Sequence, residues 1–291
     1  MAGGVGGKAE GGVSFALATI EHNGKPTACV ERDGKFYPLG ADLMALIAGG
    51  DLSRVEAKGE AITGRVLTPL QYPGKVLCAG ANYYDHIAEM GVQDLRKEAQ
   101  RLFFFFKPPR NALVGPGATV QYPAESKMFD WEGELAAVIG KRSKRLTLEN
   151  ALDAVGAWSV AIDFSARDLN QAPNTFYKLD WVAGKGQDTC CPLGPRLVPA
   201  QFVQNPQDLA LRLSVNGEVK QNARTSGMIF DIREQLVILS RIMTLDPGDV
   251  VLTGTPAGVG FPQKTFLKVG DTVSAEIESI GRLDVEIVKG D

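Results

Sequence analysis

The chain has 291 residues, of which 44% are hydrophobic and 22% charged, a length that fits one large domain or two unequal ones. Its 31 Lys and Arg residues against 34 Asp and Glu residues give a formal net charge of -3, without the basic excess typical of nucleic-acid-binding proteins. No apolar stretch reaches the roughly 18–20 residues that cross a bilayer, and the N-terminus lacks the apolar core of a signal peptide. We therefore expect a soluble, cytoplasmic protein that binds neither nucleic acid nor membrane.

The first part of the chain predicts a small β-rich unit behind an unstructured lead. Residues 1–13 are small and Gly-rich, so we expect them to be disordered. Residues 15–38 contain three short β-prone runs separated by an Asn-Gly and an Asp-Gly turn signal. Two prolines and a glycine near Pro73 indicate a boundary. We predict a small N-terminal domain over residues 14–72 and a larger domain over residues 73–291.

The larger domain is predicted to consist mostly of strands joined by turns. Strand patterns occur at 75–80, 102–106, 118–121, 133–139, 157–163, 209–215, 249–253, 272–278 and 282–288. Helical patterns cover 85–102, where Gly91 weakens the middle, and 229–243. Few helices separate the strands, so we predict a mainly β, largely antiparallel fold with peripheral helices, in the α+β class.

Cysteine and histidine usage restricts the chemistry. The four cysteines match neither a disulfide framework nor a CxxC zinc pattern, which indicates a reducing compartment. Of the two histidines, His22 precedes an Asn-Gly turn and is expected to be solvated. His86 and Glu89 are three residues apart, so on a helix they share a face, and the carboxylate would orient the imidazole as a base. An ordinary surface pair on a charged helix is the alternative.

Three carboxylates are candidates for a metal site. Glu132 and Glu134 are two residues apart at the head of a continuously apolar strand, so both side chains point to one face. Asp163 ends another apolar strand, although it could instead cap a following helix. Brought together, the three would form an all-oxygen site suited to Mg²⁺ or Mn²⁺. A solvated strand face is the alternative for the glutamate pair.

Lys185 lies between two glycines in a segment without helical periodicity. Such a lysine is either a solvated loop residue or a ligand for an anion that approaches the backbone closely. The pattern does not distinguish these possibilities.

These segments together resemble the fumarylacetoacetate hydrolase superfamily, and in particular its branch of acylpyruvases and 2-hydroxyhepta-2,4-diene-1,7-dioate isomerases. The resemblance rests on GANYYDHIAEMG, FFKPPRNALVGPG, DWEGELAAVIGK, AIDFSARDLNQ, GKGQDTCCPLGP, LSVNGEVKQNARTSGMIF and LDPGDVVLTGTPAGVG. It covers about two-thirds of the chain, from Lys75 to Gly260. It implies a mixed β-sandwich or β-roll catalytic domain, a small N-terminal domain and a homodimer.

The resemblance also implies roles for individual residues. Glu132, Glu134 and Asp163 would bind one Mg²⁺ or Mn²⁺ per subunit. His86 and Glu89 would activate water from a lid helix, and Lys185 would face the negative charge that develops on the substrate. Arg167, Thr255, Tyr83 and Gln171 would contact substrate, with a structural role beside the metal site as the alternative for Arg167. This chain reads ARDLNQ where relatives read ARDLQ, so Asn170 replaces the family glutamine and Gln171 is shifted by one position.

The main functional hypothesis is a metal-dependent hydrolase that cleaves a carbon–carbon bond in an acylpyruvate or another 1,3-dicarbonyl compound through a stabilised enolate. A lyase or isomerase of the same superfamily is the alternative: an oxaloacetate-type decarboxylase, a 2-oxo diacid enol–keto isomerase or a sugar-acid dehydratase. A non-catalytic metal-stabilised binding module would lack a dyad such as His86–Glu89.

Overall fold

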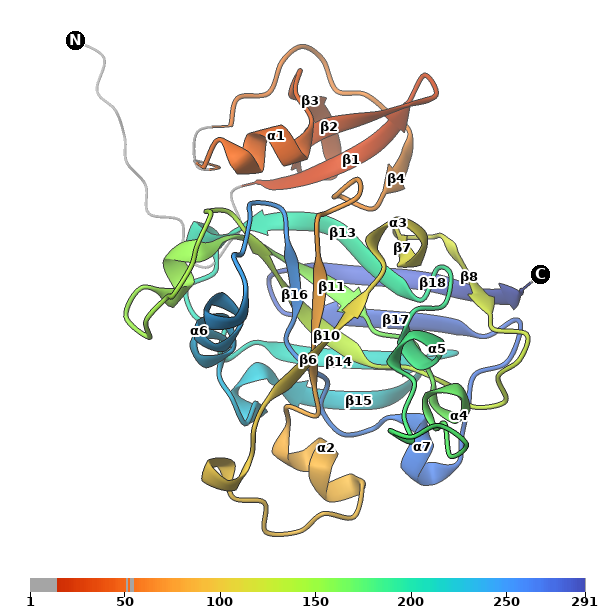
Figure 1. Ribbon diagram of the computed structural model, residues 1–291. Coiled ribbons are helices and arrows are strands. Elements are labelled where there is room, and N and C mark those ends of the chain that lie inside the picture. The colour runs from red at the N-terminus through yellow and green to blue at the C-terminus, as the bar shows by residue number, and fades with distance from the viewer. Residues whose placement is uncertain (1–14, 51, 53–54, 291) are drawn as a thin grey trace.

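The computed structural model describes residues 15–50, 52 and 55–290, so the expected lead at 1–13 lies outside the described residues. Two large β-sheets form its body (Figure 1). In spatial order, the larger, eleven-stranded sheet contains β3 (Lys35–Pro38), β2 (Lys25–Arg32), β1 (Ala16–His22), β13 (Cys191–Pro199), β11 (Val155–Ile162), β10 (Gly133–Ile139), β16 (Val250–Leu252), β5 (Val76–Gly80) and β6 (Phe103–Lys107), with β4 (Arg65–Leu67) beside β1 and β7 (Leu113–Val114) beside β13. The second, five-stranded sheet contains β15 (Glu218–Arg224), β14 (Ala210–Val215), β17 (Thr272–Ile277), β18 (Gly281–Lys289) and β8 (Thr119–Tyr122).

The two sheets pack face to face, through contacts of β10, β11 and β13 with β14, β17 and β18. Strand β10 is buried at every position, as its continuous apolar run predicted, because it lies inside the larger sheet and under the second one. Strand β18 alternates between buried and exposed residues, so only one of its faces joins the core. Most strand pairs are antiparallel, and β5–β16, β7–β13 and β8–β18 are parallel. The predicted mainly β, largely antiparallel fold is confirmed.

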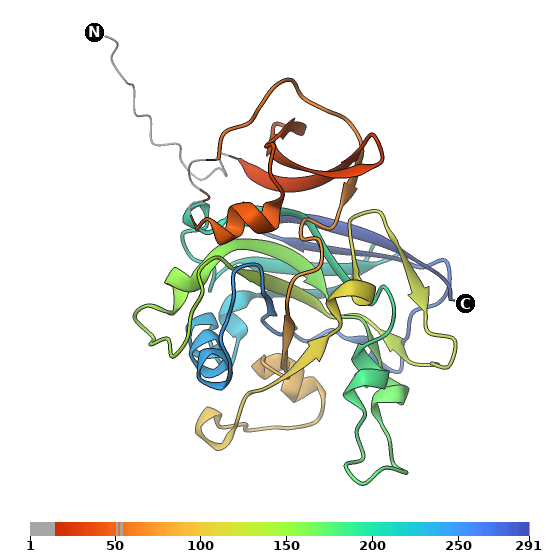
Figure 2. The same cartoon turned by 45° about the horizontal axis from the view of Figure 1, so that its top comes forward.

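The N-terminal strands extend the larger sheet, because β1 pairs with β13 in a register that places Leu17 opposite Leu197. Seen from the second direction, this unit forms a lobe at one end of that sheet (Figure 2). A small apolar cluster inside the lobe is centred on Ala18, Ile20 and Cys29. The domain boundary near Pro73 stays a prediction.

Short helices and a minor ribbon surround the sheets. The helices are α1 (Leu43–Ala48), α2 (Tyr84–Glu89), α3 (Pro109–Ala112), α4 (Arg167–Asn170), α5 (Trp181–Lys185), α6 (Ile232–Ile242) and α7 (Gly260–Gln263), and the ribbon pairs β9 (Phe129–Asp130) with β12 (Ser165–Ala166). Helix α6 begins after Asp231, whose side chain forms a capping box with Glu234. No helix among the described residues has the length and apolar character needed to cross a bilayer.

Two sequence-based predictions need correction. The helix expected over 85–102 ends at Glu89, because Gly91 takes a backbone φ of 91° that a helix does not accommodate, and only a 3₁₀ turn at Lys97–Ala99 follows. Strands β13 and β15 were missed. Three prolines interrupt the first, and the second is polar because it is an edge strand whose side chains are mostly exposed.

Candidate active site

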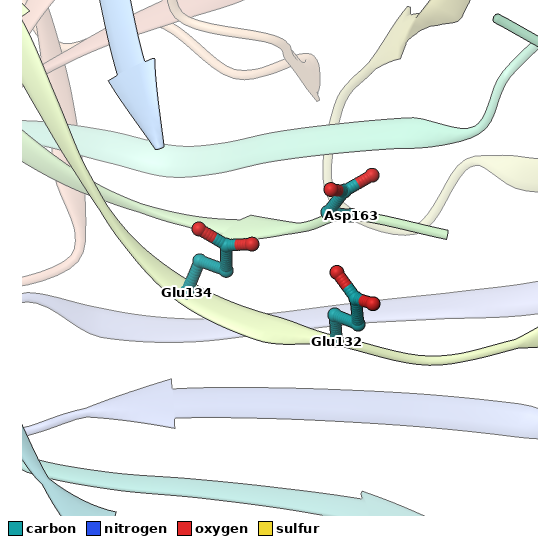
Figure 3. Close-up of side chains that lie close together, drawn as sticks. All are labelled: Glu132, Glu134 and Asp163. Atoms are coloured by element: carbon teal, nitrogen blue, oxygen red, sulfur yellow. The ribbon is translucent and has the colours of Figure 1, made fainter. Parts of the chain in front are cut away.

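The three predicted carboxylates converge at the ends of two neighbouring strands (Figure 3). Strands β10 and β11 are antiparallel with Gly133 opposite Ile162, so Glu132 and Asp163 follow directly at that edge. The backbone N–H of Asp163 donates to the carbonyl of Glu132 at 2.8 Å. Oxygen atoms from Glu132, Glu134 and Asp163 lie within 4.8 Å of one another, and these residues are only 6%, 1% and 1% exposed.

Three cations compensate two of these carboxylates. Lys185 Nζ lies 2.8 Å from both Glu132 Oε2 and Asp163 Oδ2. Arg167 Nη2 lies 2.7 Å from Glu132 Oε1, and Lys107 Nζ lies 2.8 Å from Asp163 Oδ1. Burial alone would raise the pKa of Glu132, but the positive charges of Lys185 and Arg167 hold it below its usual range.

Glu134 lacks such compensation. Its Oε2 accepts a hydrogen bond of 2.5 Å from the backbone N–H of Gly254, and no ion pair among the described residues includes it. Burial, together with the charges of Asp163 and Glu132, raises the pKa of this carboxyl well above its usual range. A buried carboxyl with no cation, beside two others whose oxygens converge on it, fits a divalent ion that prefers oxygen ligands, such as Mg²⁺ or Mn²⁺.

His86 and Glu89 form an oriented pair on α2. His86 Nδ1 lies 2.7 Å from Glu89 Oε1, and Glu89 Oε2 accepts from the backbone N–H of Gly258 at 2.9 Å. Both side chains are largely buried, so the alternative of an ordinary surface pair does not describe them. With Nδ1–H donating to the carboxylate, Nε2 is the nitrogen left to accept a proton.

A cavity of about 400 Å³ is lined by His86 of the dyad and by Glu132, one of the three carboxylates. One part of its wall is polar and contains His86, Glu132, Arg167, Lys185 and Thr255. The rest is mainly apolar, with Gln100 as a polar exception, and includes Ala79, Ala81, Ile87, Met90, Val92, Leu95, Phe103, Phe105 and Trp181. The cavity thus brings a base, one carboxylate of the acidic cluster and two cations together.

The structure decides two alternatives that the sequence left open. Lys185 is buried and ends α5, whose N-cap is Asp180, so it is not the solvated loop residue that was one of the two possibilities. The helix is a single short turn, too brief to produce a recognisable periodicity. Asp163 does not cap the helix that follows it, because the N-cap of α4 is Ala166.

The four expected substrate contacts divide into two pairs. Arg167 and Thr255 line the cavity. Tyr83 is fully buried and Gln171 is exposed, and neither is among the residues that line the cavity. Gln171 forms an isolated bridge with Leu179 instead, so the structure does not bring it to the site.

Three buried polar residues support the site and were not predicted. Lys107 Nζ contacts Asp163 and also donates to the carbonyls of Phe164 (3.0 Å) and Lys185 (2.6 Å). Asp130 Oδ2 accepts a hydrogen bond from Arg167 Nε at 2.9 Å, and Gln221 Nε2 donates a hydrogen bond to Thr255 Oγ1 at 2.8 Å. The sequence held one indication of Lys107, which directly follows the four phenylalanines of 103–106. A lysine that continues such an apolar strand is buried only if it is paired with an acidic group.

Most of the chain matches a known protein family. The family model described as "Fumarylacetoacetate (FAA) hydrolase C-terminal" matches residues 75–288. The chain belongs to this family. Its members include a Xenopus laevis protein named oxaloacetate tautomerase fahd2, mitochondrial, which is 41% identical over 225 residues, covering 77% of this chain and 68% of the relative.

Solved structures of family members share the fold. A fumarylacetoacetate hydrolase from Exiguobacterium antarcticum has a TM-score of 0.83 at 35% identity, covering 96% of this chain and all of its own. A 2-hydroxyhepta-2,4-diene-1,7-dioate isomerase from Mycobacterium marinum has a TM-score of 0.77 at 33% identity, covering 95% and 99%. A fumarylpyruvate hydrolase from Pseudomonas aeruginosa, in complex with Mn²⁺ and pyruvate, has a TM-score of 0.66 at 34% identity, covering 78% and 93%. The family therefore includes both hydrolases and isomerases.

Proposed function

We propose that this family member is a metal-dependent isomerase that moves a proton between the enol and keto forms of a 2-oxo acid. The observation that carries the proposal is a cavity lined by both the oriented His86 and Glu132, which forms the acidic cluster with Glu134 and Asp163. Isomerisation needs one positioned base beside a site that stabilises an enolate, and no second substrate. The names of the Xenopus and Mycobacterium marinum relatives favour this alternative over the hydrolase that was the main expectation from the sequence.

Each polar group of the site has its own role in the proposed proton transfer. A divalent ion held by Glu132, Glu134 and Asp163 would polarise the 2-oxo group as a Lewis acid. In the keto-to-enol direction, His86 Nε2 accepts a proton from C3 of the substrate to leave an enolate, and the imidazolium then donates that proton to the 2-oxygen. In the enol-to-keto direction, Nε2 takes the proton from the enol oxygen and donates it to C3. Glu89 stabilises the imidazolium that forms in between. The ammonium of Lys185 lies where it can stabilise negative charge on the substrate oxygen.

Hydrolysis is the second candidate, and the same dyad supports it. An imidazole held by Glu89 can take a proton from water as readily as from carbon, and the resulting hydroxide would attack the distal carbonyl of an acylpyruvate or another 1,3-dicarbonyl. The likeness to the fumarylpyruvate hydrolase favours this reaction. The two candidates differ in one respect, because only the hydrolase must admit water next to His86 while substrate is bound.

Two assays on the same Mg²⁺- or Mn²⁺-loaded preparation separate the candidates. The ultraviolet absorbance of enol-oxaloacetate reports its conversion to the keto form, and coupled detection of pyruvate reports both acylpyruvate cleavage and oxaloacetate decarboxylation. We expect fast enol decay without pyruvate. Pyruvate release from an acylpyruvate at a higher kcat/KM than enol conversion would establish the hydrolase instead. From the family resemblance we also propose one divalent ion per subunit, a homodimer and a cytoplasmic location, although the Xenopus relative is named mitochondrial.

A further inference from the structure

We propose that Phe103, Phe105 and Trp181 form an aromatic wall that selects 2-oxo acids with an apolar, planar distal group, such as an aryl or alkenyl group, over small dicarboxylates. The inference rests on the proposed function, since it names the substrate class for the same cavity. It concerns the part of the cavity that the proton-transfer chemistry does not use.

The wall is built from two elements that present rings to one side of the cavity. Phe103 and Phe105 are two residues apart on β6, so they share a face of that strand. The Trp181 ring on α5 stacks on Phe105 with centroids 5.0 Å apart and an interplanar angle of 17°, and contacts Phe103 at 5.2 Å. A methyl group added at Gly80 would come within 2.1 Å of the Phe103 ring, so that ring rests directly on the β5 backbone. The three rings thus form one continuous aromatic surface.

The wall begins at the polar end of the cavity. Trp181 and Lys185 are four residues apart on α5 and therefore lie on one face of that helix. Lys185 Nζ lies 5.1 Å from the centroid of the Phe105 ring. A 2-oxo acid whose carboxylate end lies beside Lys185 would therefore place its distal substituent along Phe105 and Trp181.

Charge argues against a second carboxylate at that distal end. Among the residues that the structure describes, Arg167 and Lys185 are the only Lys or Arg side chains that line the cavity, and both lie at its polar end, paired with Glu132. Arg96 and Arg101, on the segment bordering the cavity, are exposed and do not line it. A distal carboxylate would lose water without gaining a free counter-charge, which is unfavourable. An apolar ring would lose no such hydration.

Exposed apolar side chains at the cavity also favour an apolar distal group on the substrate. Phe103, Met90 and Val92 line the cavity yet are 41%, 43% and 49% exposed. An aryl or alkenyl group between them would remove this apolar surface from water, which is favourable.

The experiment compares two enols and one ligand that cannot enolise, all with the Mn²⁺-loaded protein. We expect a kcat/KM for enol-phenylpyruvate at least about tenfold above that for enol-oxaloacetate. Trp181→Ala should raise the Kd of benzoylformate about 10–100-fold, the scale of a lost aromatic contact, whereas Trp181→Phe should restore most of the affinity. Phe176→Ala is the matched control, because this aromatic residue lies on the adjoining segment, is 90% exposed and does not line the cavity.

The outcomes separate the wall from the proposed function. Unchanged Mn²⁺ affinity in Trp181→Ala would show that the neighbouring metal site is intact. If that affinity falls, the benzoylformate Kd of Trp181→Phe is compared with that of wild type instead. If benzoylformate binding depends on Trp181 but neither enol is converted, the aromatic wall is supported and the proposed function is contradicted. Efficient oxaloacetate turnover, with benzoylformate affinity equal in wild type, Trp181→Ala and Phe176→Ala, would overturn the wall and keep the function.

Discussion

The backbone N–H of Asp163 donates a 2.8 Å hydrogen bond to the carbonyl oxygen of Glu132. This bond continues the antiparallel pairing of β10 with β11 by one step beyond Gly133 and Ile162. Two carboxylates that are 31 positions apart in the chain thereby become neighbours on a rigid sheet edge. The acidic cluster is thus a consequence of strand register, with Glu134 added by the two-residue repeat of β10.

Removing the uncompensated carboxyl should abolish metal binding. Loss of an outer-shell partner typically lowers metal affinity about 10–100-fold, so Glu134→Gln, which removes a direct ligand, should lower Mn²⁺ affinity by about 100-fold or more. The metal-free Tm should change little, because glutamine is neutral and has a similar shape, and burial raises the pKa of the Glu134 carboxyl well above its usual range, which favours the neutral form. Calorimetric Mn²⁺ titration checks this, with the exposed strand residue Glu286→Gln as control. Undiminished affinity in Glu134→Gln would remove the proposed metal site.

The dyad should account for a general-base contribution. His86→Ala should lower kcat by roughly 10²–10⁴-fold while Mn²⁺ affinity stays unchanged. Glu89→Gln should lower kcat less, because the imidazole remains but loses the carboxylate that orients it. His22→Ala is the matched control, since His22 lies at the end of β1 and does not line the cavity. Steady-state kinetics decide, and equal losses in the His22 and His86 variants would contradict the assignment.

Residues 83–101 should become ordered when ligand binds. Helix α2 buries only His86 and ends before Gly91, and the 3₁₀ turn at Lys97–Ala99 buries nothing, so few contacts hold this segment. Hydrogen exchange with Mn²⁺ and oxalate should be slower over 83–101 than without them. Exchange in β10 should not change, since that strand is buried throughout. Identical exchange of 83–101 in both states would argue against a lid.

Lys107 should be essential for stability. Burial lowers its pKa, but the Asp163 carboxylate outweighs this effect and holds the pKa well above the usual range, so the ammonium stays charged. Lys107→Met would leave Asp163 with one cation fewer and two backbone carbonyls without their donor. Breaking a buried ion pair costs about 3–5 kcal/mol, which urea unfolding can measure. The exposed Lys144→Met serves as control, and a comparable loss in both variants would contradict this role.

Cys29 should make stability fall at alkaline pH. Burial raises the pKa of its thiol from 9.0 to about 11, so the unfolded chain loses this proton at a lower pH than the folded one. The contribution of the thiol is therefore fully present below pH 9 and is lost as the pH rises towards 11. Wild type should lose more free energy of unfolding between pH 8 and pH 10 than Cys29→Ala does. Parallel pH curves for the two proteins would contradict the shift.

The sequence by itself determined many of the strands, although not β13 or β15, and the residue types of the site. The burial of β10 at every position and the alternating burial of β18 can be read from the order of apolar and polar residues in the sequence. The order is informative because each apolar side chain gains free energy when it leaves water. The spacing of Glu132 with Glu134 and of His86 with Glu89 likewise needs only the repeat of a strand or a helix. The family motifs then assigned roles to these residues.

Tertiary structure decided which charges meet. Lys107, Lys185 and Arg167 come from three separate segments, and no local pattern shows that they converge on Glu132 and Asp163. It also decided that Gln171 lies outside the cavity and that an aromatic wall from β6 and α5 lies inside it. Electrostatic and packing contacts depend on distances in space, and those distances are set by the register of strands far apart in the chain.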